Sequence, residues 1–204
     1  MKNHLKIFLP VLFVVFAASL ASGQNGQGDI VITRPVSVLG GTKPIPVSLE
    51  GFSGEVADTL KFDLYVQGFS FVAPDVAQYQ ISGTEAGSVQ GRVVDRFAKA
   101  EILKSRSYTG ASVRKQAHAF ADDIVQAITH KNGIAQTKIA FKAQSSTGNG
   151  EIHVADFDGH NPQAVTHDNS IVAAPAWVPG RLALYYTSYQ PGNPDIFYHN
   201  LTTG

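Results

Sequence analysis

Apolar and polar residues alternate along Lys43–Phe52 with the two-residue period of a half-buried strand. The apolar side chains fall at Ile45, Val47 and Leu49. Proline has no backbone N–H to donate to a neighbouring strand. Pro44 and Pro46 therefore predict that this segment is an edge strand or the entry of a strand.

The next apolar residues recur every four positions and predict a helix over residues 53–68. They are Val56, Leu60 and Leu64. Ser53 can cap the first turn through its side-chain oxygen, and Gly68 can take the left-handed conformation that ends a helix. The apolar run Phe69–Ala73 predicts a short strand.

Glycines interrupt the apolar pattern of Tyr79–Tyr108, which predicts two or three further strands. Ser112–Lys131 predicts a second helix, which we expect Asn132-Gly133 to end. Its apolar stripe consists of Val113, Ala117, Phe120, Ile124 and Ile128. Strands interleaved with two helices predict a two-layer α+β domain over residues 24–133.

A repeat replaces the helical pattern after Gly133. Eight positions of one segment are matched in identity or chemical class 44 positions later. They are Ile139, Phe141, Gly148, Asn149, Glu151, Ile152, Val154 and Phe157, matched by Ala183, Tyr185, Gly192, Asn193, Asp195, Ile196, Tyr198 and Leu201. A period of about 40 to 45 residues with short strands is that of one four-stranded propeller blade. A chance match between two β hairpins is the alternative.

The repeat predicts an incomplete β-propeller over residues 134–204. A blade buries its faces only against neighbouring blades, and a closed ring takes at least about four of them. The chain holds one complete repeat and about half of the next, so we expect the front part of a longer protein.

The first 23 residues differ from the rest and predict a secretory signal peptide. Lys2 and Lys6 precede the apolar run Ile7–Ala18, and small residues follow at the spacing of a cleavage site. The alternative is an uncleaved anchor, but the run is shorter than the roughly 20 residues that span a bilayer. We therefore expect an exported chain that does not insert into the membrane after cleavage.

Composition excludes several classes of function. The chain has 16 Lys+Arg, 16 Asp+Glu and no cysteine. A net charge of zero with scattered basic residues argues against a nucleic-acid partner. Without cysteine there is no thiolate nucleophile, no disulfide and no cysteine-ligated metal site. No metalloprotease HExxH pair, GxSxG elbow or phosphate-binding loop occurs, so we expect no enzyme, no cofactor and no metal.

Two features resemble functional sites but have simpler interpretations. Asp156-Phe157-Asp158-Gly159 resembles the start of a calcium loop, but its glycine is in the wrong register, so we expect a turn without metal. His118 lies beside the apolar stripe of the second helix and is expected to be packed or half-exposed rather than catalytic.

Five segments of the chain carry a resemblance to a known family. They are Arg114–Val125 with Gly133–Phe141, then Glu151–Gly159, then Pro175–Gly180 with Gly192–Ile196. In this order they closely resemble the TolB family, the periplasmic β-propeller components of the bacterial Tol-Pal envelope system. The resemblance implies an α+β domain followed by a six-bladed propeller, of which about one and a half blades would lie in this chain. One turn departs from the family pattern, because Trp177-Val178-Pro179-Gly180 lacks the usual Asp and is one residue shorter.

The resemblance implies a periplasmic scaffold that maintains outer-membrane integrity and supports constriction at division. Its partners would be a Pal-like peptidoglycan-associated lipoprotein on the propeller and a TolA-like protein at the mobile mature N-terminus. Asp29, Ile30, Val31 and Ile32 could add as a strand to a partner's sheet, or could be the first strand of their own domain. Asn169, Ser170 and Ile171, in the turn before Trp177, are expected at one end of the propeller as a partner contact.

Two other functions remain open at this point. One is an exported serine peptidase whose propeller gates a catalytic domain encoded beyond residue 204. The other is a generic propeller binding module of the envelope.

Overall fold

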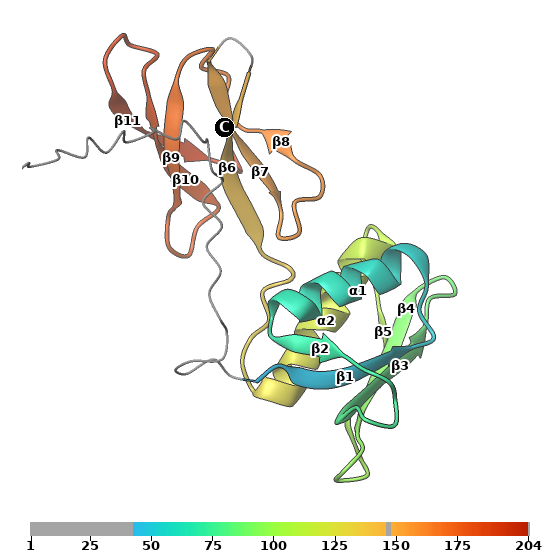
Figure 1. Cartoon of the computed structure of the whole chain (residues 1–204). Helices are drawn as coiled ribbons and strands as arrows, with labels where there is room; N and C mark the ends of the chain where they lie inside the picture. Colours follow the sequence, from blue (N-terminus) through green and yellow to red (C-terminus); the bar gives the residue numbers. More distant parts are fainter. Residues whose placement is uncertain (1–42, 146–147, 204) are drawn as a thin grey trace, which may run out of the picture. The chain divides into compact units, whose positions relative to one another are not determined.

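Five strands and two helices form the first half of the fold, shown in the computed structural model in Figure 1. The structure describes residues 43–145 and 148–203, which fall within one compact unit, Thr42–Gly204. The predicted signal peptide lies outside the described residues.

The first sheet has the strand order β2-β1-β3-β4-β5. Its strands are β1 (Ile45–Glu50), β2 (Phe69–Phe71), β3 (Tyr79–Thr84), β4 (Val89–Asp95) and β5 (Ala100–Tyr108). β1 runs parallel to both β2 and β3, and β3, β4 and β5 are antiparallel. The predicted two or three strands of Tyr79–Tyr108 are therefore three.

β1 is an interior strand, so the prediction of an edge strand is wrong, whereas the alternative of a strand entry is right. Pro46 is the second residue of β1, and pairing with β3 begins only at Val47 opposite Tyr79. Its carbonyl still accepts a hydrogen bond from the Gln78 N–H at 3.0 Å. The missing N–H thus falls before the ladder to β3 starts and removes no bond from it.

The first helix, α1 (Gly54–Val66), buries the predicted stripe of Val56, Leu60 and Leu64. Gly68 has a φ of +94°, as expected of the residue that ends a helix. Ser53 precedes the helix, but its side chain makes no cap bond and donates instead to the Glu85 carboxylate.

The second helix, α2 (Val113–Thr129), begins at Ser112, whose hydroxyl accepts the Lys115 N–H at 3.2 Å. It ends earlier than predicted, at His130, which takes a left-handed φ of 60° and donates its N–H to the Gln126 carbonyl. Gly133 is required for another reason. A Cβ there would lie 2.6 Å from the Asp122 Cα, so only glycine allows this approach.

Both helices cover the sheet and share one core with it, which makes the two layers seen in Figure 1. Phe120 of α2 is fully buried, with its ring centroid 5.8 Å from that of Phe52 and 5.1 Å from that of Tyr108. The ring stands directly over Gly91 of β4. This core is called the first core below.

The second half consists of two three-stranded antiparallel sheets. The sheet β6-β7-β8 contains β6 (Lys138–Gln144), β7 (Gly150–Asp156) and β8 (Gln163–Ala164). The other contains β9 (Val172–Trp177), β10 (Ala183–Ser188) and β11 (Asp195–Asn200). In the 44-residue repeat, β6 corresponds to β10 and β7 corresponds to β11. The repeat did not predict β9.

The two repeat sheets share a core of their own, called the second core. It contains Ile152, Val154, Val172, Leu184 and Tyr186, with Trp177 and Phe197 packed against it. The turn predicted at Asp156–Gly159 is present, since the Gly159 N–H donates to the Asp156 carbonyl and Gly159 has a φ of +81°. Within the described part of the chain, no helix combines the length and apolarity needed to cross a membrane.

Candidate partner-binding surface

The predicted contact residues Asn169, Ser170 and Ile171 form the loop between β8 and β9. The other predicted contact, Asp29, Ile30, Val31 and Ile32, lies outside the described residues. Asn169, Ser170 and Ile171 form the second half of the loop of residues 165–171.

Glu151, near the start of β7, holds this loop by three hydrogen bonds. Its carboxylate accepts the Thr166 hydroxyl at 2.6 Å, the Asp168 N–H at 3.0 Å and the Asn169 N–H at 2.8 Å. The Thr166 oxygen in turn accepts the Ile152 N–H at 2.9 Å. Charge-assisted bonds to a carboxylate are stronger than neutral ones, so the loop has a defined shape.

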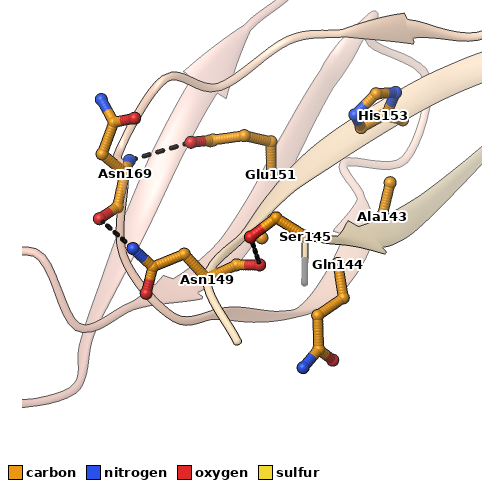
Figure 2. A pocket seen from close by; sticks show the side chains of 8 residues that line it. Ala143, Gln144, Ser145, Asn149, Glu151, His153 and Asn169 are labelled. Atoms are coloured by element: carbon orange, nitrogen blue, oxygen red, sulfur yellow. Dashed lines mark hydrogen bonds between the residues drawn. The ribbon is translucent and has the colours of Figure 1, made fainter. Parts of the chain in front are cut away.

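Asn149 secures the same loop from the β6–β7 hairpin, as Figure 2 shows. Its side-chain amide donates to the Asn169 carbonyl at 2.9 Å, and the neighbouring Gly150 N–H donates to the Ser170 carbonyl at 2.9 Å. Asn169 has a φ of 52°, a left-handed conformation that asparagine tolerates better than most residues. The identity of residue 169 is thus explained by backbone geometry.

A groove of about 350 Å³ lies between the hairpin and the loop. Side chains of Gln144, Asn149, Glu151, His153 and Asn169 line it, and Figure 2 shows them around the opening. The His153 ring packs beside Phe141, with 5.8 Å between the ring centroids. The groove is therefore lined largely by polar side chains.

The hydrogen bonds to the loop keep the Glu151 side chain ionised. Burial raises the pKa of its carboxyl, but the hydrogen bonds from Thr166, Asn169 and Asp168 outweigh burial and leave the pKa below its ordinary value of 4.5. Glu151 is therefore a carboxylate at neutral pH, with its oxygens committed to the loop.

Beside the polar groove the loop presents apolar side chains. Ile171 is 47% exposed, and Tyr189 at the end of β10 is also exposed. The Tyr189 N–H donates to the Ile171 carbonyl at 2.9 Å, which holds the two residues together. Two exposed apolar residues therefore lie next to the polar groove.

A second apolar surface lies on the outer face of the β10–β11 pair. Tyr185 faces Tyr198 across the two strands, with ring centroids 5.5 Å apart, and Ile196 is 73% exposed. The opposite face of the same strands is buried in the second core through Leu184 and Tyr186. Apolar residues on both faces are typical of a sheet that packs between two others.

Among residues 43–145 and 148–203, no group of His, Cys, Asp or Glu has the arrangement of a metal site. Asp156 is one residue of the predicted turn and pairs with Lys138 at 2.9 Å. Asp158, two residues on, points into a buried cluster with Arg114, His118 and Asp63.

Sequence reasoning missed this buried cluster and the role of Glu151. His118 is packed, as expected, but it is also ion-paired. No spacing in the sequence connects residues 63, 118 and 158, which come from three separate elements. For Glu151 a signal existed, because both repeats place an acidic residue two positions after the matched asparagine.

The chain resembles TolB proteins over most of its length. It is 33% identical over 194 residues to the Tol-Pal system protein TolB of Desulfosudis oleivorans, a match that covers 80% of this chain and 43% of that protein. It is 28% identical to the Tol-Pal system protein TolB of Nitrosococcus oceani, over 96% of this chain and 50% of that protein. The chain thus spans about half the length of the curated relatives it matches.

A solved structure supports the same fold. The crystal structure of TolB from Acinetobacter baumannii superposes with a TM-score of 0.67 at 18% sequence identity, covering 79% of this chain and 48% of that one. The mixed sheet with two helices and the further sheets therefore occur together in a known TolB. No family model matches the chain.

Proposed function

We propose that this chain, a relative of the TolB proteins over most of its length, acts as a scaffold of a Tol-Pal envelope system. In this role it would help to maintain outer-membrane integrity and support constriction at cell division through contacts with other proteins. The observation that carries the proposal is the similarity to TolB across both the helix-covered sheet and the repeat sheets.

We propose a periplasmic location for the mature chain. The support is the signal-like sequence of residues 1–23, whose small residues place cleavage after Ala21 or Gly23. Removal of Lys2 and Lys6 from the 16 basic residues leaves 14 against 16 acidic ones. The mass of the protein recovered from the periplasm identifies the cleavage site, and an intact N-terminus would contradict the proposal.

The two repeat sheets are proposed to be the first blades of a propeller. The 44-residue period and the apolar residues on both faces of β10–β11 support this interpretation. A further blade would cover Tyr185, Ile196 and Tyr198.

We propose that a Pal-like lipoprotein binds at the loop formed by Asn169, Ser170 and Ile171. The loop is held rigid by Glu151, so little ordering entropy is lost on binding. The exposed Ile171 beside Tyr189 supplies an apolar anchor, and the polar groove supplies hydrogen bonds around it.

Ile171→Asp tests this site by calorimetric titration with the soluble domain of a Pal-like lipoprotein. A central apolar anchor is worth about 2 kcal/mol or more, so the affinity should fall about 30-fold. Leu182→Asp is the matched control, because Leu182 is 59% exposed but precedes β10, at the opposite end of the sheet. Equal loss in both variants, or no binding by the folded parent chain, would contradict the proposal.

A TolA-like protein is proposed to bind the segment Asp29, Ile30, Val31 and Ile32 by strand addition. The support is its run of three β-branched residues, Ile30, Val31 and Ile32, which follows directly after a polar stretch. Deletion of residues 29–32 should abolish capture of a soluble TolA-like domain, whereas deletion of residues 24–28 should leave capture intact. Capture that survives the first deletion refutes this assignment.

A further inference from the structure

A buried cluster of charges lies where the β7–β8 turn meets the two helices. Asp158 of the turn forms an ion pair with Arg114, and its side chain is only 2% exposed. The same carboxylate lies 3.4 Å from His118 Nε2. On its other side, His118 Nδ1 is 2.6 Å from Asp63 Oδ2 of α1, which is completely buried. A buried charge is costly unless it is paired, so the four groups depend on one another.

These ion pairs join two parts of the fold that have separate cores. Asp63, Arg114 and His118 belong to helices that cover the first core, whereas Asp158 extends from a sheet of the second core. The Phe62 and Phe157 rings also meet, with centroids 6.2 Å apart.

The covalent linker between the two parts is held by Asp122 of α2 and by Gln67 at the end of α1. Asp122 accepts the Ala135 N–H at 2.8 Å and the Gln136 N–H at 3.2 Å, and the Gln67 side-chain oxygen accepts the Ile134 N–H at 3.0 Å. Beyond residue 136, the contacts between the described residues of the two parts include the charged cluster and the Phe62–Phe157 pair.

The charge on each group follows from its surroundings. Burial lowers the pKa of His118, but the hydrogen bond and charge of Asp63 and the charge of Asp158 outweigh it and raise the pKa above 6.5. Burial raises the pKa of Asp158, but the His160 N–H and Arg114 outweigh it and lower the pKa below 3.8. A cationic imidazole can donate from both nitrogens, one toward each aspartate.

Asp63 responds differently from Asp158. Burial raises its pKa above 3.8, and the hydrogen bond and charge of His118 offset only part of that increase. On acidification, Asp63 therefore takes up a proton before Asp158 does.

Other charged groups surround the cluster. Glu55 of α1 lies 3.5 Å from Arg114, and Asp122 of α2 adds negative charge near Asp63. A hollow of about 200 Å³ runs beside His118 and is lined by Lys115, Lys138 and Asp156 among others.

We propose that Asp63, His118, Asp158 and Arg114 form a charge-dependent clasp that holds the helix-covered sheet against the β7–β8 turn and opens when the charges are neutralised. The clasp is independent of the partner site proposed above, because no member lines the groove around Glu151. β7 nevertheless connects the two places, with Glu151 near its start and Asp156 at its end.

His118 and Asp158 make the stability of the clasp depend on pH in opposite directions. His118 has a raised pKa, so its contribution is present below the unfolded value and disappears as the pH rises through the folded value. Asp158 has a lowered pKa, so its contribution is present above the unfolded value and disappears as the pH falls through the folded value. The clasp is therefore closed between two limits, the protonation of Asp158 below pH 3.8 and the loss of the His118 proton above pH 6.5.

Spin labels on the full chain test the clasp, and the absence of cysteine allows two specific labelling sites. Lys61→Cys on α1 and Gln163→Cys on β8 are both exposed. At about pH 6 the parent should give a single narrow distance distribution. Asp158→Asn should lose this narrow peak, and the parent should lose it when the pH rises through the pKa of His118.

Asp156→Asn is the matched control, because it removes a neighbouring aspartate whose partner, Lys138, is largely exposed. It should keep the narrow peak. Trp177 fluorescence and helical circular dichroism report the second core and the helices, respectively, and verify folding in each sample. A narrow peak that persists in folded Asp158→Asn, or that Asp156→Asn broadens equally, overturns the proposal.

Discussion

Gly91 in β4 provides a direct test of how the first core is packed. The Phe120 ring stands on its backbone, and a Cβ at position 91 would lie within 2.7 Å of three ring atoms. Ordinary contact requires about 3.4 Å or more, so the ring or the strand must move in Gly91→Ala. Phe52 and Tyr108 border the same ring, which limits where it can go.

The expected loss can be worked from two opposing effects. Overpacking of a well-filled core costs about 1 to 3 kcal/mol. Replacing glycine by alanine within a strand returns about 0.5 to 1 kcal/mol, because glycine loses more freedom on folding. Gly91→Ala should therefore lower the free energy of unfolding by about 1 to 2 kcal/mol.

Urea unfolding, followed by helical circular dichroism, measures this loss, since both described helices cover the first core. At an m value of about 2 kcal/mol per molar, the midpoint should fall by roughly 0.5 to 1 M. Gly110→Ala is the matched control, because a Cβ there finds its nearest atom at 3.5 Å. Its midpoint should change little.

Phe120→Leu supplies the decisive comparison. Removing the ring destabilises the protein by itself, but it also removes the atoms that a side chain at residue 91 would meet. The loss in the free energy of unfolding of the double variant should therefore be about 1 kcal/mol smaller than the sum of the two single losses. Strict additivity, or a Gly91→Ala protein as stable as the parent, would refute the packing argument.

Three further substitutions test other parts of the fold. Ser112→Ala removes the cap bond to the Lys115 N–H and should cost about 1 kcal/mol in thermal or urea unfolding, and a glycine at residue 112 should cost less. Asp122→Ala leaves the N–H groups of residues 135–136 without their acceptor and should speed proteolysis of the linker, with a stability loss of about 1 to 3 kcal/mol. The pKa of Glu151 is lowered, so its contribution to the free energy of unfolding is present above pH 4.5 and is lost as the pH falls through the pKa of the folded state. Glu151→Gln should therefore weaken the dependence of the free energy of unfolding on acid pH. An unchanged pH profile in this variant would contradict the role of Glu151.

The local pattern of the sequence predicted the elements of the first half well. The α1 stripe and Ala117, Phe120 and Ile124 of α2 are buried as expected, because a four-residue apolar period is a property of one helix alone. Val113, at the first turn of α2, is 38% exposed, so this part of the predicted stripe is wrong. The place of β1 in the sheet was not predictable in this way. Pro46 suggested an edge, but whether a missing N–H matters depends on where the neighbouring strand begins to pair.

The candidate site was likewise predicted only in part from the sequence. Asn169, Ser170 and Ile171 were predicted to lie in a turn before Trp177, but the carboxylate that holds this turn was not identified. Glu151 reaches the loop only because β7 and β8 are paired, which places residues 15 to 18 positions apart in hydrogen-bond contact.

The sequence by itself determined the periodicities of this protein: two amphipathic helices among strands, a 44-residue repeat and a chain without cysteine. The helices and strands are predictable because each requires only a short-range pattern of apolar and polar residues. Only the tertiary structure decided which distant charges meet. Asp63, His118 and Asp158 are separated by 55 and 40 positions, and their charges depend on burial and on one another, which no local pattern encodes.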